Sequence, residues 1–209
     1  MARRKLTLAL APIVAGVGQR IEDDAAITVL DAAGDHLRRF GLGRWSVDDV
    51  ADAAGVGRTS VYRWFGSRDE LVHAVLAREL RETLEAASAA AARVESFEDK
   101  AVEAALVCFR ALDGSVVDHL LRNDPGAVLP LLTTGAGPLI DLARGALVPA
   151  LLAAGMVTEP LEAAVLAEAM ARLGLSFVLT RGTVVPVDRP AGLRLAIAGL
   201  LRPLLGGRP

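Results

Sequence analysis

The sequence predicts an all-α protein in which an N-terminal three-helix helix-turn-helix domain is joined to a larger helical domain. Apolar residues recur at three- and four-residue spacing through most of the 209 residues, and no strand-like alternation is long enough to indicate a sheet. Hydrophobic residues make up 53% of the chain, which is enough for a sizeable core. We expect an N-terminal arm over 1–22, the helix-turn-helix domain over 23–72 and the second helical domain over 73–209.

The composition favours a cytoplasmic protein. The net charge is only −2, and no uncharged run reaches the roughly 18 residues that a membrane span needs, so we expect no membrane partner. The single cysteine, Cys108, cannot form an internal disulfide, as is usual in a reducing cytoplasm. Because Cys108 lies in an apolar helical pattern, we expect it in the core and not at a catalytic centre.

The N-terminus imitates a secretory signal, because the basic residues 3–5 precede the uncharged residues 6–19. Pro12, Gly16 and Gly18 weaken that apolar run, and no small-residue cleavage site ends it, so we interpret residues 1–22 as an arm. Two interpretations of the arm stay open: contact with DNA phosphates or the minor groove, or a loosely packed tail.

A helix expected over 23–40 braces the motif that follows. Its apolar residues fall at helical spacing, and Gly41 and Gly43 end it. We expect Trp45 to pack at the edge of a three-helix core. The apolar residues of this helix are Ala26, Ile27, Leu30, Ala33, Leu37 and Phe40.

Residues 46–71 read as two short helices joined by a tight glycine turn. Ser46 is a good N-cap for the first helix. Gly55 ends that helix, because glycine adopts the positive φ that a Cβ disfavours. The second helix has Val61 and Phe65 on one side, four residues apart. This is the layout of a helix-turn-helix.

The outer face of the second helix indicates a polyanionic partner. Between residues 57 and 68 there are three arginines and no acidic residue, although the chain as a whole is slightly acidic. Arginine offers a planar fork to phosphate or to a guanine edge, and hydroxyl groups donate to phosphate oxygens. An ordinary solvated face is the alternative for the charges alone.

The residues that define this motif are Ser46, Val50, Ala51, Ala54, Gly55, Val56, Ser60, Val61, Tyr62, Trp64, Phe65, Ser67, Arg68 and Leu71. On these residues the chain closely resembles the DNA-binding domain of the tetracycline-repressor (TetR) family of bacterial regulators, in register over residues 24–72. Three positions depart from the family pattern. Gly57 stands where the family most often has serine, Thr59 replaces a frequent glycine, and Arg68 replaces a frequent lysine.

The resemblance implies a homodimeric repressor that binds a palindromic operator in double-stranded DNA and is released by a small-molecule effector of the C-terminal domain. We expect Arg63 to read a base edge, and Ser60 and Tyr62 to contact phosphates. The expected DNA-binding residues are Arg44, Ser46, Arg58, Thr59, Ser60, Tyr62, Arg63, Trp64 and Arg68.

Ser67 and Glu70 form a capping-box pattern at the start of a helix that is expected to run toward residue 92 and to connect the two domains. His73 on this helix is expected at the surface or at a boundary. The three histidines of the chain lack metal-ligand spacing, so we expect no metal and no cofactor.

The C-terminal domain is expected to be helical, with a turn over 123–126 and with Pro149 kinking or interrupting a helix. Its last two segments, 161–179 and 190–205, are apolar around most of their circumference and flank a loop over 182–188. Intramolecular burial explains such a pattern, and the family resemblance implies a four-helix dimer interface instead. The residues expected there are Leu166, Met170, Leu173, Phe177, Leu193, Ile197 and Leu200.

An effector pocket is expected among the helices between residues 97 and 180. Aromatic residues are sparse in this domain, so we expect a lipophilic or acyl-like effector and not a large flat cation. Each candidate lining residue also fits plain core packing. The candidates are Phe109, Leu112, His119, Thr133, Thr134, Leu142, Met170 and Phe177.

The sequence offers no convincing enzyme site, so we expect no catalytic residues. The glycine pair at 41 and 43 does not follow a strand, and Ser60 lies on a basic helix without a partnered histidine in sequence. The alternative to a regulator is a helical ligand-binding or scaffold protein of the same fold without operator-specific DNA binding.

Overall fold

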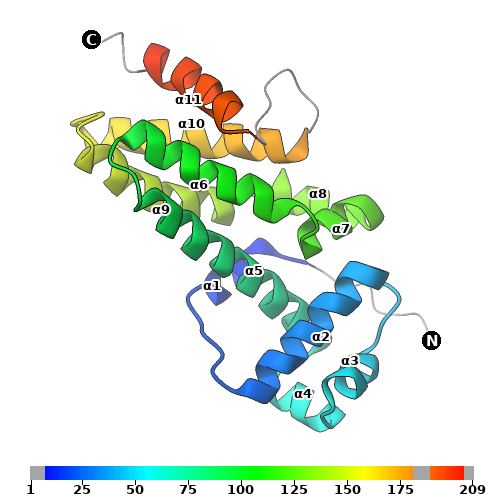
Figure 1. Cartoon of the computed structure of the whole chain (residues 1–209). Coiled ribbons are helices and arrows are strands. Elements are labelled where there is room, and N and C mark those ends of the chain that lie inside the picture. The colour runs from blue at the N-terminus through cyan, green and yellow to red at the C-terminus, as the bar shows by residue number, and fades with distance from the viewer. Residues whose placement is uncertain (1–7, 181–188, 205–209) are drawn as a thin grey trace. The chain divides into compact units, whose positions relative to one another are not determined.

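Eleven α-helices and no strand make up the part of the chain that the structure describes (Figure 1), which confirms the expected all-α fold class. The computed structural model describes residues 8–180 and 189–204, and the side chains of residues 200–204 lie outside that description. No single helix among these residues is long and apolar enough to cross a membrane, and only the consecutive helices α8 and α9 together reach that length and composition. The helices are α1 (Leu10–Gly16), α2 (Asp24–Phe40), α3 (Val47–Ala54), α4 (Arg58–Phe65), α5 (Arg68–Ala91), α6 (Phe97–Leu112), α7 (Val116–Asn123), α8 (Pro125–Leu132), α9 (Gly137–Ala153), α10 (Pro160–Leu179) and α11 (Pro190–Leu204).

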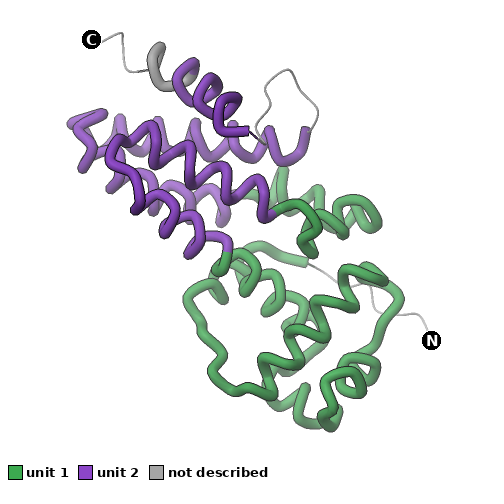
Figure 2. Tube along the Cα trace, in the orientation of Figure 1, with its two compact units in different colours: residues 1–82, 112–136 green, residues 83–111, 137–209 purple. Residues whose placement is uncertain are grey.

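The chain forms two compact units (Figure 2). The first unit contains the described residues up to 82 together with residues 112–136, and the second contains residues 83–111 and the described residues from 137 onward. This division differs from the boundary expected between residues 72 and 73, because α5 runs through that point without a break and because α7 packs against α2. Helices α7 and α8 therefore belong to the same unit as the helix-turn-helix.

Helix α2 has a capped start and a left-handed glycine at its end. The Asp23 carboxylate accepts hydrogen bonds from the backbone N–H groups of Ala25 and Ala26, at 2.9 and 3.2 Å. Gly41 follows the helix with a φ of +64°, a conformation that strains any residue with a side chain. The buried face of the helix comprises Ala26, Val29, Leu30, Ala33, Gly34 and Leu37.

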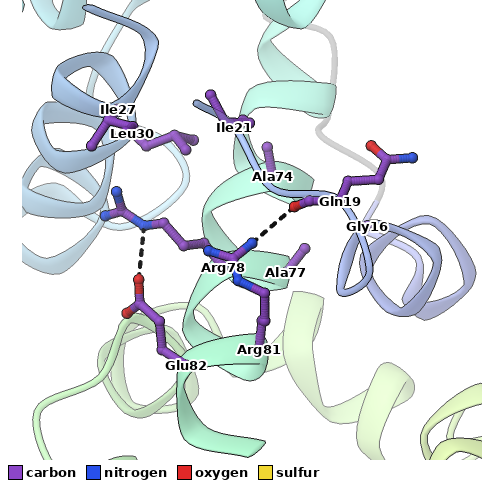
Figure 3. A pocket seen from close by; sticks show the side chains of 10 residues that line it. All are labelled: Gly16, Gln19, Ile21, Ile27, Leu30, Ala74, Ala77, Arg78, Arg81 and Glu82. Atoms are coloured by element: carbon purple, nitrogen blue, oxygen red, sulfur yellow. Dashed lines mark hydrogen bonds and ion pairs between the residues drawn. The ribbon is translucent and has the colours of Figure 1, made fainter. Parts of the chain in front are cut away.

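The segment around α1 packs onto the first unit. Leu8, Leu10 and Ile13 are buried, so this part of the expected arm is folded, while the basic residues 3–5 lie outside the described residues. A cavity of about 180 Å³ lies between this segment, α2 and α5 (Figure 3). At its edge Arg81 donates a hydrogen bond to the carbonyl oxygen of Gln19, 2.9 Å away.

The second unit is held together by two apolar clusters. One joins α9 and α10, which pack along each other, through Leu151, Leu166 and their neighbours. The other joins Val102 and Leu106 of α6 to Leu193 of α11. Pro149 lies inside α9, and the helix continues past it to Ala153, so of the two expected effects, a kink or an interruption, the interruption does not occur.

Two expected side-chain environments are wrong. His73 is 7% exposed, because α5 is buried around most of its circumference where it belongs to the first unit. Cys108 is exposed and not in the core. A helix turns by about 100° per residue, so Cys108 faces away from the buried side of α6, which Val102 and Leu106 form.

Candidate nucleic-acid interface

Helix α3 and the turn after it have the local structure that the sequence predicts. The backbone N–H of Asp49 donates to the Ser46 hydroxyl at 3.2 Å, and the Ser46 N–H donates to the Asp49 carboxylate at 2.7 Å, so the two residues form a capping box. Gly55 then adopts the left-handed conformation with a φ of +67°. Val56 follows, and its N–H donates to the carbonyl oxygen of Ala51, which closes the turn.

Helix α4 has one buried side and one solvent-facing side. Val61 and Phe65 are buried inside the first unit, where α4 contacts α2 and α3. No side chain caps the start of α4, because Gly57 occupies the N-cap position where a hydroxyl would bond to the first turn. The exposed residues of the other side are Arg58, Thr59, Tyr62 and Arg63, while Ser60 and Trp64 are half-buried.

Arg58 is engaged with its neighbours at the surface. Its guanidinium lies 2.7 Å from the Asp48 carboxylate and 3.4 Å from the Tyr62 hydroxyl, which accepts a hydrogen bond from it. The guanidinium carbon also lies 5.3 Å from the centre of the Tyr62 ring. The bond to Tyr62 and the charge of Asp48 raise the pKa of Arg58, so the group stays charged. A DNA phosphate at this position would have to compete with Asp48.

Arg63 is the more available arginine of the outer face. Its guanidinium carbon lies 5.4 Å from the centre of the Trp64 ring. Arg63 is exposed, and within the described part of the chain no carboxylate forms an ion pair with it. A guanidinium that is held by a ring and free of a carboxylate is well suited to a phosphate or a base edge.

Arg68, at the start of α5, is half-buried and held from two sides. Its guanidinium carbon lies 4.3 Å from the centre of the Trp45 ring. One of its N–H groups donates to the carbonyl oxygen of Leu42. Trp45 itself is buried at the edge of the three-helix core, as the sequence predicts. The contact between Arg68 and Trp45 was not predicted. A tryptophan expected at the edge of the core and an arginine at the start of the next long helix could have indicated it.

Ser46 is held by hydrogen bonds in the capping box, whereas Arg44 is exposed to solvent. The Ser46 hydroxyl donates to the Asp49 carboxylate at 2.7 Å while it accepts from the Asp49 N–H, so it belongs to the capping box.

An open cleft of about 1090 Å³ runs through the first unit beside these residues. Its lining includes Ser46, Arg58, Tyr62, Ser67 and Arg68, which come from the helix-turn-helix and the start of α5. Residues of the α7–α8 turn and of α8 also line it, which the sequence did not predict, because they lie more than fifty positions later in the chain. These residues are Asp124, Gly126, Ala127, Pro130 and Leu131.

The expected effector-pocket residues are divided between the two units. Phe109 and Phe177, in the second unit, meet edge to face with 6.3 Å between ring centres. In the same unit Met170 packs against the cluster around Leu151, and Leu142 is half-buried. Leu112, His119, Thr133 and Thr134 belong to the first unit.

The polar members of that set have hydrogen-bond partners four residues earlier in the sequence. A ring nitrogen of His119 lies 3.0 Å from the carbonyl oxygen of Ser115. The Thr133 hydroxyl donates to the carbonyl oxygen of Leu129 at 2.7 Å, and the Thr134 hydroxyl to that of Pro130 at 3.4 Å. Leu112, at the end of α6, is half-buried.

Two of the seven residues expected at a dimer interface are buried within the chain itself, and four are half-buried. Leu166 and Leu193 are buried in the two clusters of the second unit, and the side chain of Leu200 lies outside the described residues. Met170, Leu173, Phe177 and Ile197 are half-buried. Among the described side chains of α10 and α11, the large apolar ones that are exposed are Leu161, Val165 and Leu195, at 77%, 64% and 71%.

Comparison with known proteins gives two family matches and one close sequence relative. Residues 29–75 match the bacterial regulatory proteins of the tetR family, and residues 98–203 match the C-terminal domain of the bacterial tetracyclin repressor. The HTH-type transcriptional regulator AlkX of Mycobacterium tuberculosis is 34% identical over 158 residues, which are 72% of this chain and 73% of that protein.

Two solved structures share the fold. The TetR family repressor AlkX from Dietzia, implicated in biodegradation of n-alkanes, matches with a TM-score of 0.62 and 27% identity, over 90% of this chain and all of that one. The R. erythropolis transcriptional repressor QsdR, at 24% identity, matches in fold with a TM-score of 0.53, over 87% of this chain and 96% of the other.

Proposed function

Because the chain belongs to the TetR family and is a DNA-binding transcriptional regulator, we propose that it is a homodimeric repressor which leaves a palindromic operator when a small lipophilic effector binds. The observation that carries the proposal is the outward side of α4, where Arg58, Thr59, Tyr62 and Arg63 are exposed together on the second helix of a helix-turn-helix. This side is locally basic in a chain of net charge −2, which favours contact with a polyanion. The proposal assigns the chain no catalytic role and places it in the cytoplasm with its DNA.

We assign different DNA contacts to different parts of this surface. Arg63 reads a base edge, because it is exposed and its guanidinium is oriented by Trp64. Tyr62 and Ser60 of α4 contact phosphates, because short or stiff polar side chains at the rim of a recognition helix suit that role. Arg68, at the start of α5, contacts a phosphate through its charged, planar guanidinium. Arg44, Ser46, Arg58, Thr59 and Trp64 complete the proposed interface.

The exposed apolar residues of α10 and α11 support a dimer. Leu161, Val165 and Leu195 leave large side chains in water, which is unfavourable for a lone chain and typical of an association surface. A two-fold dimer presents each residue twice, so it carries two α4 helices related by that symmetry. The half-sites of the operator then lie about one helical turn, or a multiple of it, apart.

We place the lipophilic effector in the second unit. Phe109 and Phe177 meet there edge to face, and Met170 packs against the apolar cluster around Leu151, so apolar side chains are available to such a ligand. The Dietzia relative is implicated in biodegradation of n-alkanes, and we propose an aliphatic compound or an acyl chain as the effector of this chain. The melting temperature should rise with fatty acids or alkanes of increasing chain length. A rise with polycyclic cations alone would contradict this part of the proposal.

Binding to a labelled fragment of the chain's own upstream DNA tests the regulatory proposal. We expect two chains per fragment, preference over a scrambled fragment of equal length, and affinity that falls steeply as salt rises. Equal affinity for the two fragments would show only non-specific binding and would contradict the proposal that the upstream DNA contains an operator.

A further inference from the structure

Asp124 occupies the position of a helix cap but bonds elsewhere. It directly precedes Pro125, the first residue of α8, and an aspartate at that position normally accepts hydrogen bonds from the first turn. No such bond is present in α8. Instead, the Asp124 carboxylate accepts a hydrogen bond from the backbone N–H of Leu42, 2.9 Å away and 82 positions earlier in the sequence.

Leu42 connects Asp124 to Arg68. Its N–H donates to Asp124, and its carbonyl oxygen accepts from the guanidinium of Arg68. Leu42 is 7% exposed, so both bonds lie close to the protein interior, where water competes with them only weakly. The backbone of Leu42 is thus bonded both to the α7–α8 turn, through Asp124, and to the start of α5, through Arg68.

The fit around the Asp124 carboxylate is tight. Gly41 lies beside it, and a Cβ at Gly41 would overlap the carboxylate oxygen that Leu42 binds. The loop after α2 therefore follows the position of Asp124 closely, since there is no free space between them.

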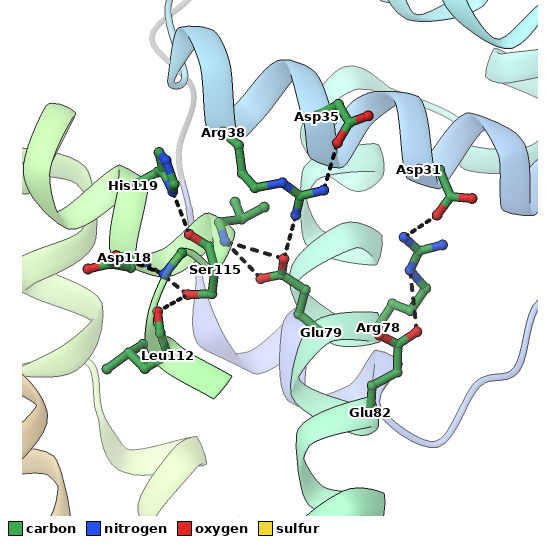
Figure 4. A network of polar contacts seen from close by, with 12 residues as sticks. Asp31, Asp35, Arg38, Arg78, Glu79, Glu82, Leu112, Ser115, Asp118 and His119 are labelled. Atoms are coloured by element: carbon green, nitrogen blue, oxygen red, sulfur yellow. Dashed lines mark hydrogen bonds and ion pairs between the residues drawn. The ribbon is translucent and has the colours of Figure 1, made fainter. Parts of the chain in front are cut away.

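Helix α7 is anchored at its other end as well (Figure 4). The carboxylate of Glu79 accepts hydrogen bonds from the backbone N–H of Val116, at 3.1 and 3.3 Å, and from Arg38 of α2, at 3.0 Å. The α7–α8 turn is thus fixed relative to α2 and α5 and can serve as a rigid support for the loop that Leu42 belongs to.

We propose that Asp124 is a positioning residue for operator binding: through the Leu42 peptide it holds Arg68 toward the cleft where a DNA phosphate lies. Arg68 and Asp124 both line the same cleft. The Trp45 ring restrains one face of the guanidinium, and the Leu42 carbonyl restrains its edge. This inference rests on the phosphate contact that the proposed function assigns to Arg68.

Operator affinity and its salt dependence test the role of Asp124. We expect Asp124→Ala and Arg68→Ala each to weaken binding roughly tenfold, the size of one lost charge-assisted hydrogen bond. Each variant should also lower, by about one, the steepness with which the logarithm of the binding constant falls against the logarithm of the salt concentration (the salt slope), as loss of a single phosphate contact does. The double variant should bind no more weakly than either single one, because the two residues act through one contact. A role in folding alone would leave the slope unchanged.

Two companion variants complete this experiment. Asp124→Asn keeps an oxygen that accepts from Leu42 and should restore binding. Asn123→Ala is the matched control, since Asn123 lies in the same turn but donates only to the carbonyl oxygen of His119 in its own helix. If Asp124→Ala does not fold, Asp124→Glu replaces it, because the longer side chain keeps the charge and misplaces the carboxylate.

The outcomes separate this inference from the proposed function. If Arg68→Ala weakens binding while Asp124→Ala, or the glutamate variant in its place, matches the wild type in affinity and slope, the role of Asp124 is overturned and the phosphate contact stands. If Arg68→Ala itself matches the wild type, the phosphate contact is wrong and the role of Asp124 falls with it.

Discussion

The guanidinium of Arg68 lies over the indole ring of Trp45, with 4.3 Å between the guanidinium carbon and the ring centre. A cation over the face of a tryptophan is attracted by the ring's negative face. This pair links the buried edge of the three-helix core to the head of α5, so it contributes to stability as well as to the shape of the DNA-binding surface.

Replacing Trp45 by alanine should lower the free energy of unfolding by about 3–5 kcal/mol, because a large buried ring is lost and a cavity remains. Urea denaturation followed by circular dichroism measures the change. Trp64→Ala is the control in the same motif, since that ring is half-buried and should cost much less. An equal loss for both variants would contradict a core role for Trp45.

Arg63→Ala should relax the base preference of the chain, at a cost on the order of 1–3 kcal/mol for the operator if the guanidinium reads a guanine. Tyr62→Phe is the contrasting variant, because it removes only a hydroxyl and should weaken binding alike on all sequences. Competition between the operator and single-base variants measures both effects. An unchanged preference in Arg63→Ala would remove its base-reading role.

Glu79 should make stability depend on pH. Burial raises the pKa of the Glu79 carboxyl, although the bonds from Val116 and Arg38 oppose that shift. A carboxyl whose pKa is higher in the folded state contributes its full stability below its unfolded pKa, about 4.3, and loses it as the pH rises through the folded pKa.

The free energy of unfolding of the wild type, minus that of Glu79→Gln, should therefore fall as the pH is raised from about 4 toward neutral. Urea denaturation at a series of pH values measures the difference, with Glu85→Gln as the control because Glu85 is exposed on the same helix. A difference that grows with pH would show that the bonds to Glu79 outweigh its burial.

Leu195→Asp should dissociate the proposed dimer, because the symmetry of a two-fold interface introduces the buried charge twice. Sedimentation velocity should then give the mass of a single chain. Ala86→Asp, at an exposed position of α5, is the control and should stay dimeric. A dimer that survives both Leu195→Asp and Val165→Asp would move the interface away from this surface.

The features that the sequence predicts well are those that neighbouring residues determine. The cap at Ser46 and the glycine turn at Gly55 depend on residues within a few positions, and the structure confirms them. The burial of Val61 and Phe65 follows from helical spacing in the same way.

The features that sequence reasoning missed depend on contacts between distant parts of the chain. Nothing near Leu42 indicates that Asp124 binds its N–H, and the apparent helix-cap position of Asp124 points to a different role. The burial of His73 could not be read from α5 alone, because helical spacing gives the faces of a helix but not how many of them are covered.

A footprint of the upstream DNA, with and without an aliphatic effector, decides whether the chain is an operator-specific repressor. We expect protection of two symmetric half-sites about one helical turn or a multiple apart, lost when the effector is added and lost in Arg63→Ala at the same protein concentration. Protection that covers the fragment evenly, or none at all, would contradict an operator-specific repressor.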